Sequence, residues 1–393
     1  MKKFSKNMVK SMAKPQYYTK TLKPSLNLNQ HQLYNKSWNT LFKHNVPTQV
    51  PLSEGVHRSL GQPLTRHHSL FMYQNGTGRV LTPTMRPDNS TALVLRDEIL
   101  RSRDLYTIFG GVWSGSYEPL QMDETTRRNI YKAIYASWEN KTDMTLSIIN
   151  GRMALSGCML SIFGADHIVA TPGALYSCVD PILGMIPEGG QTFFLAHLNA
   201  KHPGLGTFLA LTGYELKAND LMALEIATQY HNSPGFGHYI VDRMQESFSQ
   251  PNKTIFNQTL EEVLPSPSFK KRTLKITDTE LALINSLFST AECYEDLEGA
   301  APEMKRRIDR IPKAVVNATI RAIHYASELT LDEAMNMEFR VATNIANSKD
   351  LENETTDNLF KKNSDAFDLH LPGSLYADFL DLDNVPTRFV SKK

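Results

Sequence analysis

The sequence predicts an α/β fold with a wound parallel core and a helical C-terminal region. Short apolar runs predict buried strands at residues 105–109, in a segment that ends at residues 148–151, and at residues 165–170. Between the first two strands, segment 123–138 carries Ile130 and Ile134 at helical spacing. Strands that alternate with helices in this way form parallel sheets with helices packed against them.

Two further strands are expected ahead of this core. Residues 70–73 and 78–83 have strand-like composition and are separated by a glycine-containing turn. A turn at residues 86–90 then leads into a helix predicted over 91–103.

The C-terminal third is predicted to be helical, with paired helices over 311–329 and 331–347. Three helix starts are indicated by capping boxes, in which a hydroxyl accepts from a backbone amide and an acid three residues later reaches back. These pairs are Thr277 with Glu280, Ser289 with Glu292, and Thr330 with Glu333.

Charge is divided unevenly along the 393 residues. Residues 1–53 contain nine lysines and no acid, whereas the whole chain has 42 basic and 41 acidic residues, so the remainder has 33 basic and 41 acidic residues. Such an arm is typical either of a disordered or cleaved mitochondrial leader or of a segment that lies on RNA. The RNA hypothesis assigns the phosphate contacts to Lys2, Lys3, Lys6, Lys10, Lys14, Lys20 and Lys23.

Composition excludes several classes of function. No apolar run approaches the ~20 residues that span a membrane. The three cysteines, Cys158, Cys178 and Cys293, do not have the spacing of metal ligands, and we predict reduced core thiols and no metal site.

The most specific pattern lies between residues 149 and 231. A strand ends at Asn150-Gly151, the turn Met-Ala-Leu-Ser-Gly follows at 153–157, and a helix is predicted from residue 158. A second strand then leads to an acidic turn that carries Asp180 and Glu188, eight residues apart. In order and spacing this segment resembles the acyl-CoA-binding core of the crotonase (enoyl-CoA hydratase/isomerase) superfamily, and the 3-hydroxyisobutyryl-CoA hydrolase branch in particular.

The resemblance covers about residues 68–350, and it implies a crotonase-like wound ββα spiral core. We therefore expect a basic N-terminal arm at 1–64, the core at 65–260, a helical region of the same fold at 261–350, and a C-terminal extension at 351–393. The extension is either a surface for partner proteins or a frayed terminus.

In the resembling enzymes, two backbone amides form an oxyanion hole for the thioester carbonyl. The resemblance assigns these donors to the amides of Ser116 and Ser156. Where the family has glycines, this sequence has Leu155 and Ser156, and Tyr117 replaces an acid. Because glycine allows a backbone to approach a ligand closely, we expect these side chains to fill or reshape the pocket.

The hydrolase branch also uses two acids, as general base or nucleophile and as partner acid. The resemblance assigns these degenerate catalytic positions to Asp180 and Glu188, with the two residue types exchanged. Two structural interpretations compete: Asp180 caps the turn before Pro181, and Glu188 accepts from the amides that follow it. The acid of hydratases aligns with Met159, so enoyl-CoA hydration is not expected.

Two functions remain open. The first is a catalytically inactive structural protein that resembles the degenerate form found in the mitochondrial small ribosomal subunit. Its arm and C-terminal extension would contact rRNA and neighbouring ribosomal proteins in the matrix. The alternative is an active mitochondrial hydrolase of valine catabolism, with a coenzyme A thioester as its ligand. Neither hypothesis requires another cofactor.

Overall fold

The computed structural model describes four strands between residues 63 and 111 by their backbone, and residues 122–139, 144–232, 253–264 and 273–361 in more detail. The arm lysines, Ser116, Tyr117, the turn 86–90, the helix expected at 91–103 and the tail beyond residue 361 lie outside these residues. Among the described helices, none is long and apolar enough to cross a membrane.

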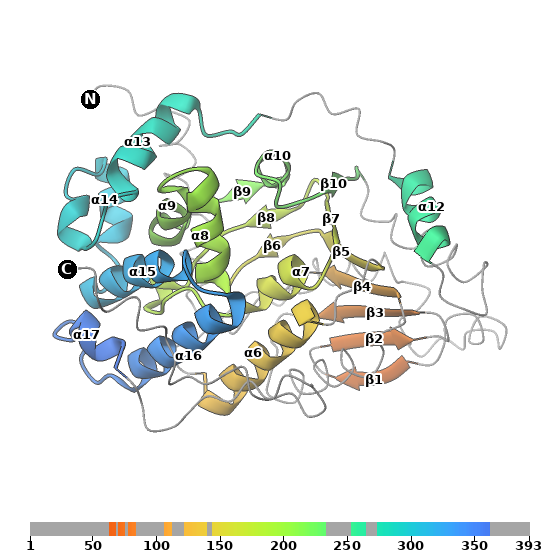
Figure 1. The fold of residues 1–393 in the computed structure, drawn as a ribbon, viewed down its shortest axis with the longest axis horizontal. Coiled ribbons are helices and arrows are strands. Elements are labelled where there is room, and N and C mark those ends of the chain that lie inside the picture. The colour runs from red at the N-terminus through yellow and green to blue at the C-terminus, as the bar shows by residue number, and fades with distance from the viewer. Residues whose placement is uncertain are drawn as a thin grey trace, which may run out of the picture.

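A seven-stranded sheet forms one side of the molecule (Figure 1). Its first three strands are antiparallel and include the two strands predicted at 70–73 and 78–83, and the other four strands are parallel. In spatial order they are β1 (Pro63–His67), β2 (Leu70–Gln74), β3 (Gly78–Pro83), β4 (Tyr106–Gly111), β5 (Thr145–Ile149), β7 (His167–Ala170) and β10 (Gln229–Tyr230).

A smaller sheet continues from the carboxyl end of β5. It consists of β6 (Arg152–Met153), β8 (Leu175–Tyr176) and β9 (Leu216–Lys217). The chain turns out of the large sheet at Gly151, where φ is +145°, a conformation that L residues rarely adopt. The segment that resembles the acyl-CoA-binding core therefore begins where the two sheets meet.

Helices cover the sheets and form the other side of the molecule (Figure 1). The central ones are α6 (Glu124–Glu139), α7 (Met159–Phe163), α8 (Gln191–Lys201), α9 (Leu205–Thr212) and α10 (Ala218–Ala223), with short 3-10 helices η2 (Ser156–Cys158) and η3 (Pro181–Leu183). The later ones are α12 (Lys253–Val263), α13 (Asp278–Phe288), η4 (Tyr294–Leu297), α14 (Pro302–Ile308), α15 (Lys313–Ala326), α16 (Leu331–Asn347) and α17 (Thr356–Leu359).

The C-terminal helices share one core with the central segment. The pair α15 and α16 pack against each other and against α8, so Leu195, Phe208 and Val315 belong to the same buried cluster. The first residues of the expected C-terminal extension are also folded, because Leu359 of α17 is buried and its carbonyl accepts from Asn344 of α16 at 2.8 Å.

Two of the three predicted capping boxes are confirmed, at Thr277 and Thr330. The third is wrong. Ser289 ends α13, and its hydroxyl donates to the Asn285 carbonyl at 2.5 Å. The next helical turn, η4, is capped by Asp296 instead, whose carboxylate accepts from the Cys293 amide at 3.1 Å.

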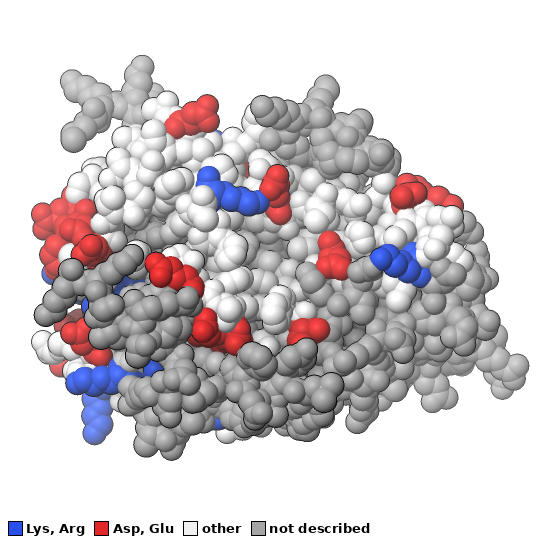
Figure 2. All heavy atoms as spheres, viewed as in Figure 1, with Lys and Arg blue, Asp and Glu red and all other residues white. Residues whose placement is uncertain are grey.

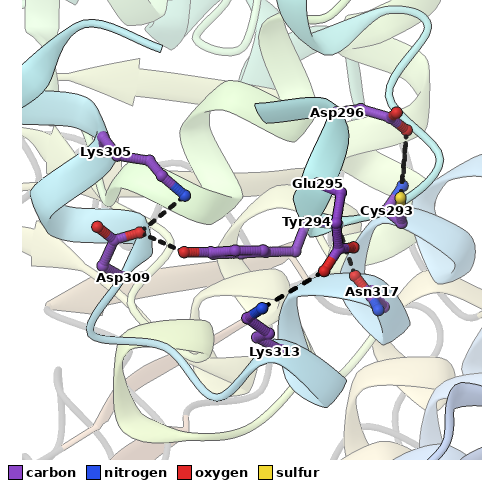
Figure 3. Close-up of polar contacts among 8 residues, drawn as sticks. All are labelled: Cys293, Tyr294, Glu295, Asp296, Lys305, Asp309, Lys313 and Asn317. Atoms are coloured by element: carbon purple, nitrogen blue, oxygen red, sulfur yellow. Dashed lines mark hydrogen bonds and ion pairs between the residues drawn. The ribbon is translucent and has the colours of Figure 1, made fainter. Parts of the chain in front are cut away.

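Polar side chains around Tyr294 connect η4 to α14 and α15 (Figure 3). The Tyr294 hydroxyl donates to Asp309 at 2.7 Å. Lys305 Nζ lies 3.7 Å from the centre of the Tyr294 ring, and Lys313 Nζ lies 4.6 Å from it. Cation–π contacts of this kind are worth about 0.5–1 kcal/mol at exposed sites, so this cluster orients the loops more than it stabilises the fold.

Close packing of α8 against α9 gives a testable prediction. A Cβ atom at Gly206 of α9 would lie 2.0 Å from the Leu195 carbonyl oxygen of α8. Gly206→Ala is therefore expected to lower the free energy of unfolding by about 1–3 kcal/mol or more, because backbone must move. The matched control is Gly299→Ala, whose new Cβ would be 3.9 Å from its nearest neighbour, Leu287 Cδ1. Urea unfolding should find the control within about 0.5 kcal/mol of the parent; equal losses in both variants would contradict the packing argument.

Candidate functional site

The site begins at the turn after β6, where the backbone keeps a glycine-like conformation without glycine. Leu155 has φ of +62°, in the left-handed region, which costs a non-glycine residue roughly 1–2 kcal/mol. Its side chain is buried and packs with Ala154, Val179 and Leu183. The backbone of this turn is thus left-handed at Leu155, and the leucine side chain packs against Val179 and Leu183, which lie on either side of Asp180 in sequence.

Ser156 follows and begins the helical segment. The first bond of this segment runs from the Cys158 amide to the Leu155 carbonyl at 3.1 Å. The Ser156 and Gly157 amides precede it, and amides at a helix start have no partner within the helix. The Ser156 side chain is buried, and a Cβ atom at Gly189 would lie 2.9 Å from Ser156 Cβ. This places the Ser156 turn directly against the turn that contains Glu188.

Asp180 lies between β8 and α8 and is only 1% exposed. Its Oδ2 accepts from Gln191 Nε2 at 3.1 Å and lies 3.8 Å from the Cys178 thiol. Burial and the charge of Glu188 raise the pKa of Asp180 to about 7. Its side chain makes no capping bond to η3, so the interpretation of Asp180 as a cap before Pro181 is wrong.

Glu188 is 2% exposed and forms an ion pair with Arg127 of α6. The Arg127 Nε donates to Glu188 Oε2 at 2.9 Å, and the Tyr131 hydroxyl donates to the same oxygen at 3.4 Å. Burial raises the pKa of Glu188 above its ordinary value, and the Arg127 guanidinium opposes that rise. The interpretation in which Glu188 binds the amides after it is wrong for Gly190, whose amide donates to Glu338.

The structure therefore brings Asp180, Glu188 and Ser156 into one buried region. Ser116, the other expected oxyanion donor, lies outside the described residues, as do the seven arm lysines. No group of three or more histidine, cysteine or acidic side chains suitable for a metal ion occurs within the part of the chain that the structure describes.

Sequence analysis did not identify Arg127, Tyr131, Gln191 or Glu338. Arg127 had a visible signal, because it shares one helical face with Ile130 and Ile134, and a lone arginine on an apolar face needs a buried partner. Glu338 gave the same signal, as an acid among the buried residues of α16. Which partners they meet depends on the packing of helices far apart in sequence.

Comparison with known proteins identifies the family. The sequence model described as enoyl-CoA hydratase/isomerase matches residues 116–367. The chain belongs to this family. The match continues past Asp350, where the resemblance was expected to fail.

Curated relatives in this family are 3-hydroxyisobutyryl-CoA hydrolases with mitochondrial names. The chain is 28% identical to the Homo sapiens protein over 204 residues, which are 50% of this chain and 51% of that one. It is 28% identical to the Xenopus laevis protein over 218 residues, 52% of this chain and 54% of that one. The chain thus spans about half the length of the curated relatives it matches.

Solved structures of other family members confirm the crotonase-like fold. A carnitinyl-CoA dehydratase from Mycobacterium thermoresistibile superposes with a TM-score of 0.60 at 14% identity, covering 77% of this chain and 98% of that one. An enoyl-CoA hydratase from Rhodobacter sphaeroides 2.4.1 superposes with a TM-score of 0.53 at 13% identity, covering 71% and 86%.

The raised pKa of Asp180 predicts how stability depends on pH. Burial moves the pKa of this carboxyl from 3.8 to about 7, so between these values the folded protein holds a proton that the unfolded chain releases. The contribution of this proton to the free energy of unfolding is fully present below about pH 4 and is lost as the pH rises to about 7. Between pH 5 and pH 7 the free energy of unfolding of the wild type should therefore fall by about 2–3 kcal/mol more than that of Asp180→Asn.

Urea unfolding across this pH range measures the difference. Asp278→Asn, at an exposed carboxylate in the first turn of α13, is the matched control and should follow the wild-type curve. If Asp180→Asn has the same pH dependence as the wild type, Asp180 does not carry a proton near neutrality.

Proposed function

We propose that this chain is a catalytically inactive structural component of the mitochondrial small ribosomal subunit, built on a 3-hydroxyisobutyryl-CoA hydrolase-like fold. The observation that carries the proposal is the buried ion pair between Arg127 and Glu188. The acid that the resemblance assigns to catalysis is bound to the protein itself.

The ion pair resists rearrangement around a substrate. Arg127 and Glu188 are 1% and 2% exposed, so a Glu188 carboxylate that turned toward a thioester would have to break a buried ion pair. Loss of one member of a buried pair typically costs about 3–5 kcal/mol. Catalysis would have to overcome this cost in each turnover.

The oxyanion turn supports the same conclusion. A thioester carbonyl must approach the Ser156 amide within hydrogen-bond distance to be stabilised. The Leu155 side chain is buried among Ala154, Val179 and Leu183, and Ser156 lies against the Gly189 turn, so the two residues that flank that amide are closely packed. The fold is thus suited to be retained as a scaffold.

Charge supports an RNA-containing partner. The nine lysines of residues 1–53 can neutralise phosphates, while the remainder of the chain carries more acids than bases. Acidic side chains are visible on the face shown in Figure 2, and a large group of them lies near α14. In this proposal the arm contacts rRNA and the acidic body contacts neighbouring basic proteins. Mitochondrial location is supported by the relatives' names, and the matrix position follows from the ribosome.

Thioester hydrolysis tests the loss of catalysis. The purified full chain is expected to hydrolyse 3-hydroxyisobutyryl-CoA no faster than Asp180→Ala does, because Glu188 stays paired and the Ser156 amide is crowded. The human relative serves as positive control, and circular dichroism verifies that both forms are folded. Turnover by the wild type that disappears in Asp180→Ala would overturn the inactive assignment.

Association with the small subunit tests the structural role. The full chain is expected to sediment with mitochondrial small subunits, and replacement of the seven arm lysines from Lys2 to Lys23 by glutamine should weaken this association. When the logarithm of the binding constant is plotted against the logarithm of the salt concentration, each lost phosphate contact should reduce the slope by about one unit. The matched control replaces seven exposed lysines and arginines of the body by glutamine. A wild-type chain that stays in the supernatant would contradict the proposal.

One observation favours the hydrolase as a second candidate. Glu188 Oε1 is buried and, within the described part of the chain, has no hydrogen-bond partner, which is unusual for a carboxylate oxygen. Asp180 would exchange a proton near neutral pH, as a general acid or base requires. With a water or thioester between these groups, the pair could act in hydrolysis, and the turnover assay decides between the candidates.

A further inference from the structure

Glu338 is a fully buried acid on α16, and its hydrogen-bond partners lie far away in sequence. Its Oε2 accepts from the Gly190 amide at 2.6 Å, and its Oε1 accepts from the Thr192 amide at 2.7 Å. The Thr192 hydroxyl donates to the same Oε1. Three donors therefore converge on one carboxylate. Burial raises the pKa of Glu338 to about 8, while the bonds from Thr192 and Gly190 oppose the rise.

These bonds replace a local cap at the start of α8. The N-cap residue is Gly190, which has no side chain that could accept from the first amides of the helix. Glu338 accepts from the Gly190 and Thr192 amides instead. The beginning of α8 is thus fixed by α16 rather than by its own sequence.

Both glycines of the turn before α8 are closely packed against neighbouring segments. Gly189 has φ of +73°, and a Cβ atom there would lie 2.8 Å from Ile134 Cδ1 of α6 and 2.9 Å from Ser156 Cβ. Gly190 has φ of +91°, and a Cβ atom there would lie 2.6 Å from the Phe163 ring of α7. A shift of Gly190 would therefore displace Glu188, because the backbone between these two residues is closely packed.

We propose that Glu338 is a positioning residue, which holds the Glu188–Gly190 turn so that the Glu188 carboxylate meets Arg127. The proposal concerns the placement of Glu188 and does not rest on the proposed function, because the same turn must be held in a scaffold and in an enzyme. Glu338 acts through the Gly190 and Thr192 amides.

Glu338→Gln tests the proposal. A glutamine has one oxygen and one NH₂ group, so one of the two amides meets a donor instead of an acceptor. Nuclear magnetic resonance on the full chain measures proton exchange at the Gly190 and Thr192 amides and at Arg127 Nε. We expect exchange at Arg127 Nε and at one or both amides to become about tenfold faster or more, as for loss of a buried hydrogen bond.

The matched control is Glu333→Gln, the same substitution on the same helix, at a residue that caps α16 locally through the Thr330 amide. Exchange at Arg127 Nε should be unchanged there. If Glu338→Gln accelerates the two amides alone, Glu338 is only a helix cap and the positioning role is overturned. No acceleration at any of the three sites also overturns it.

A milder variant covers the case in which Glu338→Gln does not fold. Thr192→Val keeps the shape of the side chain and both backbone bonds but removes the hydroxyl that donates to Glu338. Exchange at Arg127 Nε is expected to rise severalfold in this variant. A value equal to that of the wild type would refute the coupling between Glu338 and Glu188.

Discussion

The buried ion pair between Arg127 and Glu188 is the constraint on which the arrangement of the site depends. It joins α6 to the turn before α8 in the buried interior of the protein. Because an unpaired charge in such a place is costly, α6 and the acidic turn must keep their relative positions whenever the protein is folded. The same contact determines what Glu188 can do: its Oε2 is bound, and only Oε1 is left without a partner among the described residues.

Around this pair, the turn after β6 has a glycine-like backbone at a position where this sequence has leucine. Leu155 adopts a conformation that glycine adopts at little cost, which indicates that the surrounding structure imposes the path of the turn. Its side chain then fills the adjacent space and packs on Val179, next to Asp180. Fold alone does not fix function, so these particular contacts matter more than the family of the chain.

The C-terminal helices are part of the site as well as of the core. Glu338 reaches from α16 to the first amides of α8, and Leu331 at the start of α16 lies beside Gly190. The Thr330 capping box marks the start of α16, and Glu338 lies further along that helix, where it contacts a residue 148 positions away in sequence.

Sequence by itself determined the α/β fold, the paired helices α15 and α16, the caps at Thr277 and Thr330, and the family. These depend on local patterns: alternation of strands and helices, helical spacing of apolar residues, and hydroxyl–acid pairs. It also selected Asp180 and Glu188, because the family resemblance aligned them. The cap at Ser289 failed because the same hydroxyl–acid spacing also fits a helix end, and only the following backbone decides between them.

Tertiary structure decided what those residues meet. Arg127 and Glu338 are recognisable in the sequence as charges on apolar helix faces, but their partners are chosen by how α6, α8 and α16 pack. The raised pKa values of Asp180 and Glu338 have the same origin, since burial depends on the assembled core and not on neighbouring residues in the chain. A charge in the sequence shows that a partner is required, and only the three-dimensional packing shows which one it is.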